Sequence, residues 1–122
     1  MSMRRVAVVL AALVGLSACG GERVREAENV ARAFLGALAD NRTEEACALF
    51  GPRVLADEDC AAALEKLTPA TIVETEVWGD GAIVRAGSGT LFLSEFNRGW
   101  LVTAAGCVDR GEVPYDCAVG GP

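Results

Sequence analysis

The chain has 122 residues, with 11 basic and 17 acidic side chains, five cysteines and no histidine. The lack of histidine excludes Ser-His-Asp triads, Cys-His dyads and imidazole metal ligands. A net charge of −6 without a basic run argues against nucleic acid as a partner, and the length allows one domain.

The first 18 residues have the pattern of an export signal. Two arginines, Arg4 and Arg5, precede an uninterrupted apolar run from Val6 to Leu16. A helix of that length spans about 16 Å, roughly half of the bilayer core, so the run is too short for a transmembrane anchor. A charged start followed by a short apolar run is typical of secretory signals.

The residues at the end of the apolar run resemble the lipobox of bacterial lipoproteins. Leu16-Ser17-Ala18-Cys19 supplies an aliphatic residue, two small residues and a cysteine. The resemblance implies a diacylglyceryl group on the Cys19 sulfur and cleavage of a signal peptide, residues 1–18, before it. Two acyl chains hold a protein stably at a membrane. We therefore expect a lipid anchor at the outer face of the cytoplasmic membrane; an ordinary secretory signal with an incidental cysteine is the alternative.

Cleavage would leave residues 19–122, which carry nine basic and 17 acidic side chains. Anionic lipid headgroups repel an acidic domain. Residues 19–23 are therefore expected to form a lipidated tether that holds the protein away from the membrane. Residues 24–117 are expected to form a single α+β domain, and residues 118–122 to be frayed.

Three helices are predicted after the tether. Apolar residues recur at helical spacing from Val24 to Leu38, and this helix should end near Asp40-Asn41 because asparagine tolerates the left-handed cap conformation. Thr43 and Asp57 can cap two shorter helices, and Gly51-Pro52 should end the first of them.

Four strands are predicted from Thr71 onward, where the apolar period changes to two. A hairpin turn at Asp80-Gly81 would place Glu76 opposite Arg85. Two later glycine-containing loops separate strands at 90–96 and 100–105. The expected fold class is thus α+β, with three N-terminal helices packed on a four-stranded antiparallel meander.

The last two predicted strands carry apolar residues on both faces. An antiparallel sheet covered on one side should alternate more cleanly, so the second face should be covered by the C-terminal segment, a partner or a ligand. The turn-rich tail from Gly106 to Cys117 is predicted to be a disulfide-closed loop that packs on the sheet.

Assigning Cys19 to lipid leaves Cys47, Cys60, Cys107 and Cys117. Four cysteines allow three pairings, and short separations favour Cys47–Cys60 and Cys107–Cys117. Each of these rings would stabilise the fold by roughly 3 kcal/mol in the chain-entropy model. A zinc site of four thiolates is the alternative, although neither pair has the two-residue spacing that such sites favour. Free thiols or other pairings also stay open.

Together, several features resemble small lipoproteins of actinobacteria. They are the lipobox, the alanine-rich helix with Ala33-Phe34-Leu35, a cysteine in each of the next two helices, Gly99-Trp100, and the final Pro114-Tyr115-Asp116-Cys117. The order of three helices and a curved meander is similar to nuclear-transport-factor-like cone domains, in which helices cover a bent sheet. Such a likeness implies a fold and not a function. The chain lacks an early strand pair among the helices, which argues against a roomy pocket.

Two groups of carboxylates have both a chemical and a structural interpretation. Asp57-Glu58-Asp59 could hold a cation, but helix capping explains it and no glycine-bearing calcium loop surrounds it. Glu74 and Glu76 could form an acid/base pair, but a solvated strand face with Arg85 as the partner is the simpler interpretation.

The sequence therefore predicts a non-enzymatic envelope lipoprotein without cofactor or metal, which binds a protein partner or a small apolar ligand. It indicates no oligomeric state. The candidate binding surface is aromatic and consists of Trp78, Phe92, Phe96, Trp100 and Tyr115. The simpler interpretation is core and rim for Trp78 and Trp100, and packing beside a disulfide for Tyr115. One alternative is a small isomerase- or hydrolase-like cone-fold enzyme that uses Tyr115 and carboxylates. Another is a purely structural component of the envelope.

Overall fold

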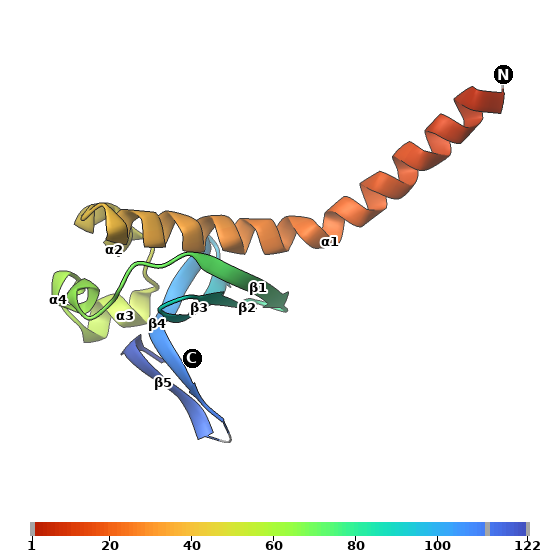
Figure 1. The fold of residues 1–122 in the computed structure, drawn as a ribbon. Coiled ribbons are helices and arrows are strands. Elements are labelled where there is room, and N and C mark those ends of the chain that lie inside the picture. The colour runs from red at the N-terminus through yellow and green to blue at the C-terminus, as the bar shows by residue number, and fades with distance from the viewer. Residues whose placement is uncertain (1, 112, 122) are drawn as a thin grey trace.

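The computed structural model describes the backbone of residues 2–111 and 113–121, and the side chains of residues 21–111 and 114–121. Within these residues, four helices precede five strands (Figure 1). Their bounds are α1 (Ser2–Ala39), α2 (Thr43–Ala48), α3 (Pro52–Asp57), α4 (Cys60–Glu65), β1 (Ile72–Trp78), β2 (Gly81–Ala86), β3 (Gly89–Phe96), β4 (Gly99–Arg110) and β5 (Val113–Gly120). The α+β class is confirmed, although the sequence predicted three helices and four strands.

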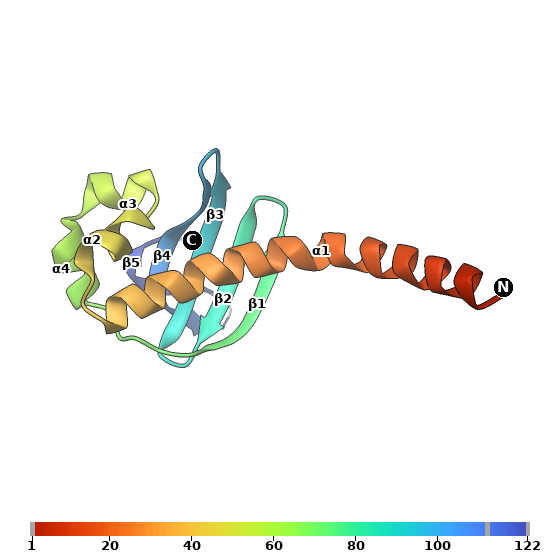
Figure 2. The ribbon, with the colours of Figure 1, turned by 90° about the horizontal axis from the view of Figure 1, so that it is seen from above.

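Helix α1 crosses one face of the sheet, and the three short helices gather beside its C-terminal end (Figure 2). The predicted apolar stripe is the face of α1 that packs against the sheet, and Ala27, Ala31 and Phe34 are fully buried. The small alanine side chains let the helix backbone approach the strands closely. Asn41, at φ +57°, is the left-handed residue that follows the helix, as predicted.

The segment after α2 differs from the prediction, because a further helix begins directly after Gly51, where the sequence predicted only the end of the preceding helix. Pro52 is the first residue of α3, a position where proline is favoured because the missing N–H would be unpaired anyway. The residue that caps the next helix, α4, also differs from the predicted one. Asp59, and not Asp57, accepts a hydrogen bond from the Ala62 backbone N–H at 3.1 Å and caps α4.

The strands form an antiparallel meander in the order β1-β2-β3-β4-β5. Two-residue loops at Gly87-Ser88 and Asn97-Arg98 join β2 to β3 and β3 to β4, at the two sites where the sequence predicted hairpin loops.

The register of the first hairpin differs from the prediction by two residues. Trp78 pairs with Gly81, so the loop is Gly79-Asp80. Gly79 has φ +54°, which suits the first central position of a type II′ turn. A shift of two residues leaves every side chain on its predicted face of the sheet.

The C-terminal segment forms a strand where the sequence predicted a closed loop and a frayed end. Strand β5 pairs with the second half of β4, and Cys107 lies directly opposite Cys117. Val119 is fully buried in the hydrophobic core. This apolar side chain and the adjoining disulfide hold residues 118–120 in the sheet, which corrects the frayed boundary at 118.

A further segment extends the sheet beside the first half of β4. The Gly51 N–H donates to the Val102 carbonyl oxygen at 2.8 Å, and the Val102 N–H donates to the Leu49 carbonyl oxygen at 2.8 Å. Phe50 thus forms a parallel bridge to Val102. The chain between α2 and α3 thus lies along the first half of β4, the part of that strand with which β5 does not pair.

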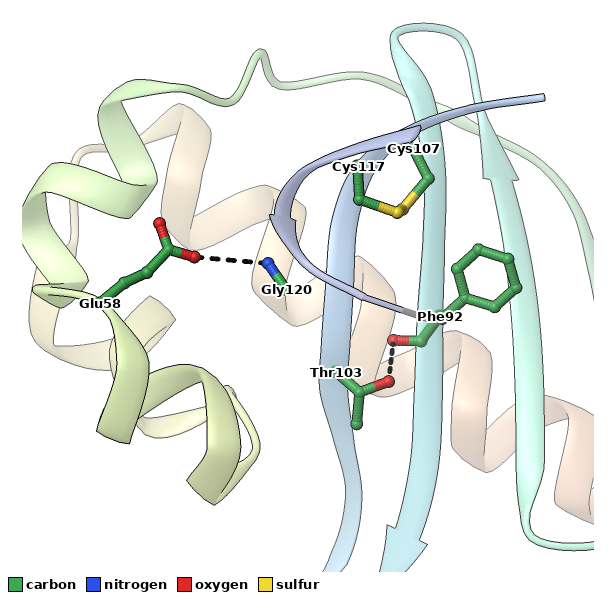
Figure 3. The surroundings of a disulfide bond; sticks show 6 residues. All are labelled: Glu58, Phe92, Thr103, Cys107, Cys117 and Gly120. Atoms are coloured by element: carbon green, nitrogen blue, oxygen red, sulfur yellow. Dashed lines mark hydrogen bonds between the residues drawn. A yellow bond between two sulfur atoms is a disulfide. The ribbon is translucent and has the colours of Figure 1, made fainter. Parts of the chain in front are cut away.

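Two disulfides join neighbouring elements, with the pairings that sequence separation favoured. Cys47–Cys60 links α2 to α4, and Cys107–Cys117 links β4 to β5 (Figure 3). With all four sulfurs in disulfides, none is a free thiolate that could bind zinc.

Candidate functional site

The five aromatic residues predicted as a binding surface do not lie together. Trp100 is only 3% exposed and belongs to the core between α1 and the sheet. It is therefore not a surface residue, because the alternation along β4 turns its ring toward α1. The guanidinium of Arg23 lies over this ring at 5.5 Å from its centroid.

Two of the aromatic residues pack against each other on the face of the sheet that points away from α1. We call it the outer sheet face; it carries Glu74, Glu76, Ile83, Arg85 and Phe92. Phe92 and Tyr115 meet edge to face, with ring centroids 5.0 Å apart. The β4–β5 hairpin bends away from α1 (Figure 1), and Tyr115 in β5 packs against Phe92 on this face. The C-terminal segment therefore covers part of the second apolar face, which was one of the three expected covers.

The other two aromatic residues, Trp78 and Phe96, lie at one end of the sheet. We call this end, formed by the loops Gly79-Asp80 and Asn97-Arg98, the hairpin end. The Glu95 N–H donates to the Asp80 carbonyl oxygen at 2.8 Å and joins the first of these loops to the end of β3. Trp78 is 57% exposed and Phe96 is 37% exposed, so the hairpin end presents aromatic surface to solvent.

Arg23 fixes the start of the packed part of α1 to the hairpin end. Its Nη2 donates to Glu95 Oε1 at 2.6 Å and to the Gly79 carbonyl oxygen at 2.8 Å. The sequence had placed Arg23 in a free tether. One signal could have revealed its role: Arg23 precedes Ala27 and Ala31 at intervals of four residues, so it extends the buried stripe of the helix.

A groove opens between α3 and strands β3 and β4. Its volume is about 430 Å³, within the ~300–1,000 Å³ range of small-molecule sites. Pro52, Val54 and Phe96 supply apolar walls, and the polar groups come from Arg53, Ser94 and Thr103. Thr103 Oγ1 donates to the Phe92 carbonyl oxygen at 3.2 Å (Figure 3), which holds this hydroxyl at the floor of the groove.

The space between the C-terminal half of α1 and the sheet is much smaller. A pocket of about 110 Å³ is lined there by Phe34, Leu38, Leu67 and Leu91, among others. This volume is below the ~300 Å³ at which ligand sites usually begin. Side chains therefore fill most of the region where a cone fold would enclose its ligand.

The carboxylates proposed for acid/base chemistry lie on the outer sheet face beside a cation. Arg85 Nη1 is 3.1 Å from Glu74 Oε1 and 3.6 Å from Glu76 Oε2. Partial burial disfavours the guanidinium, but the charges of Glu76 and Glu74, with a smaller contribution from Tyr115, outweigh it and raise the pKa of Arg85. Both carboxylate side chains stay about half exposed, so the arrangement is a paired surface cluster.

Glu58, from the other acidic group, joins the helical layer to the end of β5. Its Oε1 accepts from Lys66 Nζ at 2.8 Å, and its Oε2 accepts from the Gly120 N–H at 3.3 Å (Figure 3). The bond from Lys66 is the largest cause that lowers the pKa of Glu58; partial burial opposes it and Gly120 adds to it. Among the side chains that the structure describes, no three His, Cys, Asp or Glu residues cluster as metal ligands would.

Comparison with protein-family models, with curated proteins and with solved structures gives no match for this chain. In the part of the chain that the structure describes, no helix is both long and apolar enough to cross a membrane. Function therefore has to be argued from the motif and the geometry of the chain itself.

Proposed function

We propose that the protein is a lipoprotein anchored through Cys19 at the outer face of the cytoplasmic membrane, where it binds an envelope protein or a small apolar ligand without catalysis. The observation that carries the proposal is the lipobox, Leu16-Ser17-Ala18-Cys19, directly after a charged and apolar leader. The two disulfides agree with it, because such bonds persist in oxidising compartments outside the cytoplasm.

The groove beside α3 supports the binding role. It combines apolar walls with a few polar groups, the usual composition of a site for an apolar molecule or an apolar side chain. Ser94 and Arg53 could donate hydrogen bonds to an occupant that carries an acceptor or an anionic end, and Thr103 Oγ1, which donates to Phe92, could accept one.

Lipidation is tested by labelling cells with a radioactive fatty acid. The wild-type protein should be labelled and should sediment with membranes, and Cys19→Ala should lose both properties. Ser17→Ala is the matched control, because alanine keeps a small residue at that lipobox position and should leave labelling unchanged. Labelling that persists in Cys19→Ala would overturn the anchor.

The binding role is tested by photo-crosslinking in intact cells, followed by mass spectrometry. A photoreactive residue in place of Arg53, at the rim of the groove, should form an adduct with one protein or one small molecule. The same residue in place of Glu44, on the exposed surface of α2, is the control. Equal, unspecific adducts at both positions would argue against the groove.

One observation favours the enzyme as a second candidate. Tyr115 packs against Phe92 on the face that carries Glu74 and Glu76, and from there it contributes to the raised pKa of Arg85. The pairing of these carboxylates with Arg85 and their exposure favour the non-catalytic proposal. Tyr115→Phe separates the two, since it keeps the ring against Phe92 and removes the hydroxyl. Conversion of a substrate by the wild-type protein that is lost in Tyr115→Phe would support an enzyme.

A further inference from the structure

The distance between the proposed lipid and the folded protein is short. Arg23 lies four residues after Cys19 and is held by Glu95 and by the Gly79 carbonyl oxygen. In the structure α1 runs without interruption through this stretch, so four residues advance about 6 Å at 1.5 Å per residue. Even a fully extended stretch would reach only about 14 Å.

That length is comparable to the lipid headgroup layer. The headgroups add roughly 6 Å on each side of the hydrocarbon core, and a diacylglyceryl group on Cys19 would place its sulfur at their level. Arg23 and the hairpin end that it contacts would then lie against the membrane. A protein that stands away from the surface on a free tether does not fit this geometry.

The hairpin end has a side chain suited to such a place. Trp78 directly precedes Gly79, whose carbonyl oxygen Arg23 binds, and it is one of the large apolar side chains left exposed. Tryptophan is enriched at membrane–water interfaces, because its ring is apolar and its N–H can reach water or headgroups. The second aromatic residue of this end, Phe96, is also exposed.

We propose that the hairpin end rests on the bilayer in which Cys19 is anchored, with Trp78 in the headgroup region. The inference depends on the proposed lipidation of Cys19 and adds an orientation to it. In this orientation the part of α1 that follows Cys19 starts at the membrane, and the short helices and the β4–β5 hairpin lie farther from the membrane.

The test uses the mature, lipidated protein reconstituted into phosphatidylcholine vesicles that contain a phosphatidylcholine with a shallow nitroxide label. The fluorescence difference between wild type and Trp78→Phe isolates the emission of Trp78 from that of buried Trp100. The reference is Trp78→Phe combined with Val108→Trp. Val108 is 54% exposed and lies nine residues along β4 from Gly99, away from the hairpin end.

Nitroxide quenching of Trp78 should exceed that of a tryptophan at position 108 several-fold. Equal quenching at the two positions, in protein that floats with the vesicles and carries lipid by mass spectrometry, would overturn the orientation and leave the anchor intact. Protein that carries no lipid on Cys19 would overturn the proposed function, and the orientation with it.

A second pair of variants tests the contact made by Arg23. Arg23→Ala removes the link between α1 and the hairpin end, and quenching of Trp78 should fall in this variant. Arg25→Ala removes the same charge from an exposed position on the same turn of helix and should leave the quenching unchanged. Equal quenching in the two variants would overturn the role of Arg23 in the orientation.

Discussion

At the scale of single residues, Gly120 is the position at which strand β5 contacts both β4 and the helical layer. Its N–H donates to Glu58, in the connection between α3 and α4. Its φ of +67° lies in the left-handed region, which glycine occupies without strain. A Cβ at this position would overlap the Thr103 carbonyl oxygen. Space and conformation therefore both require glycine here.

Gly120→Ala should lower the free energy of unfolding by more than about 1 kcal/mol, because alanine is incompatible with both the conformation and the space. Gly121→Ala is the matched control, since a Cβ at Gly121 would meet no atom within 4 Å. Urea unfolding followed by circular dichroism measures both variants. An equal stability of the two proteins would contradict this account of β5.

Glu58 should make the stability depend on pH at the acidic end. Because folding lowers the pKa of Glu58, its contribution is fully present above the ordinary carboxylate range and is lost as the pH falls through the lowered value. The melting temperature of wild type should exceed that of Glu58→Gln at neutral pH, and this difference should shrink below about pH 4.

Glu65→Gln is the control for this pH dependence, because it removes an exposed carboxylate from the neighbouring helix α4. Its melting temperature should stay parallel to that of wild type through the acidic range. A difference between Glu58→Gln and wild type that is the same at every pH would show that charge on Glu58 is not the cause.

At the scale of elements, β5 depends on contacts with other parts of the fold, which no local sequence pattern indicates. Its residues are mostly exposed, and one apolar side chain, Val119, reaches the core. A strand with so few apolar contacts needs support from its neighbours. The bond from Cys107 to Cys117 supplies it, by fixing β5 against β4 at one directly opposed pair.

Replacing both Cys107 and Cys117 with alanine should destabilise the protein by about 3 kcal/mol, because the unfolded chain gains conformational freedom when the cross-link is absent. The double replacement avoids leaving an unpaired thiol. Val108→Ala, at an exposed site beside Cys107, should change stability by less than about 0.5 kcal/mol. A denaturation midpoint that is unchanged in the double variant would contradict the supporting role.

The elements that sequence patterns predicted well are those with local causes. The stripe of α1 and the left-handed Asn41 follow from spacing and from one side chain. The register of the first hairpin was wrong because Gly79-Asp80-Gly81 offers two acceptable turns. The strand β5 was missed because its proline and the preceding Gly106 and Gly111 are typical of a loop, and its pairing is decided by Val119 and a disulfide.

The same distinction between local and long-range causes explains which contacts of the candidate site the sequence could predict. Alternation could assign Phe92 to the outer sheet face, but the sequence could not show that Tyr115 covers it, because that contact depends on the bend of the β4–β5 hairpin. For Trp100 the sequence allowed both a core and a surface position, because aromatic residues are common both in cores and at interfaces. The groove joins Pro52 to Phe96, and no local pattern connects residues so far apart.

At the scale of the whole molecule, the two disulfides should both be present in the mature protein. The intact mass of the non-reduced protein should be about 4 Da below that of the fully reduced protein, one hydrogen for each bridged thiol. Peptide mapping without reduction should recover Cys47 joined to Cys60, and Cys107 joined to Cys117. Equal masses before and after reduction would exclude both bonds.

The borders of the sheet have a consequence for how copies of the protein behave at high local density on a surface. The backbone around Phe50 and strand β5 together pair with one edge of β4, whereas β1, among the residues that the structure describes, pairs with β2 alone. At Val73, which is 75% exposed, the pairing of β1 with β2 is irregular, and the charged residues Glu74 and Glu76 follow in the same strand. Bulges and charges on an edge strand oppose its pairing with a strand of another molecule. Neighbouring copies of the protein should therefore not pair through β1 into a continuous intermolecular sheet.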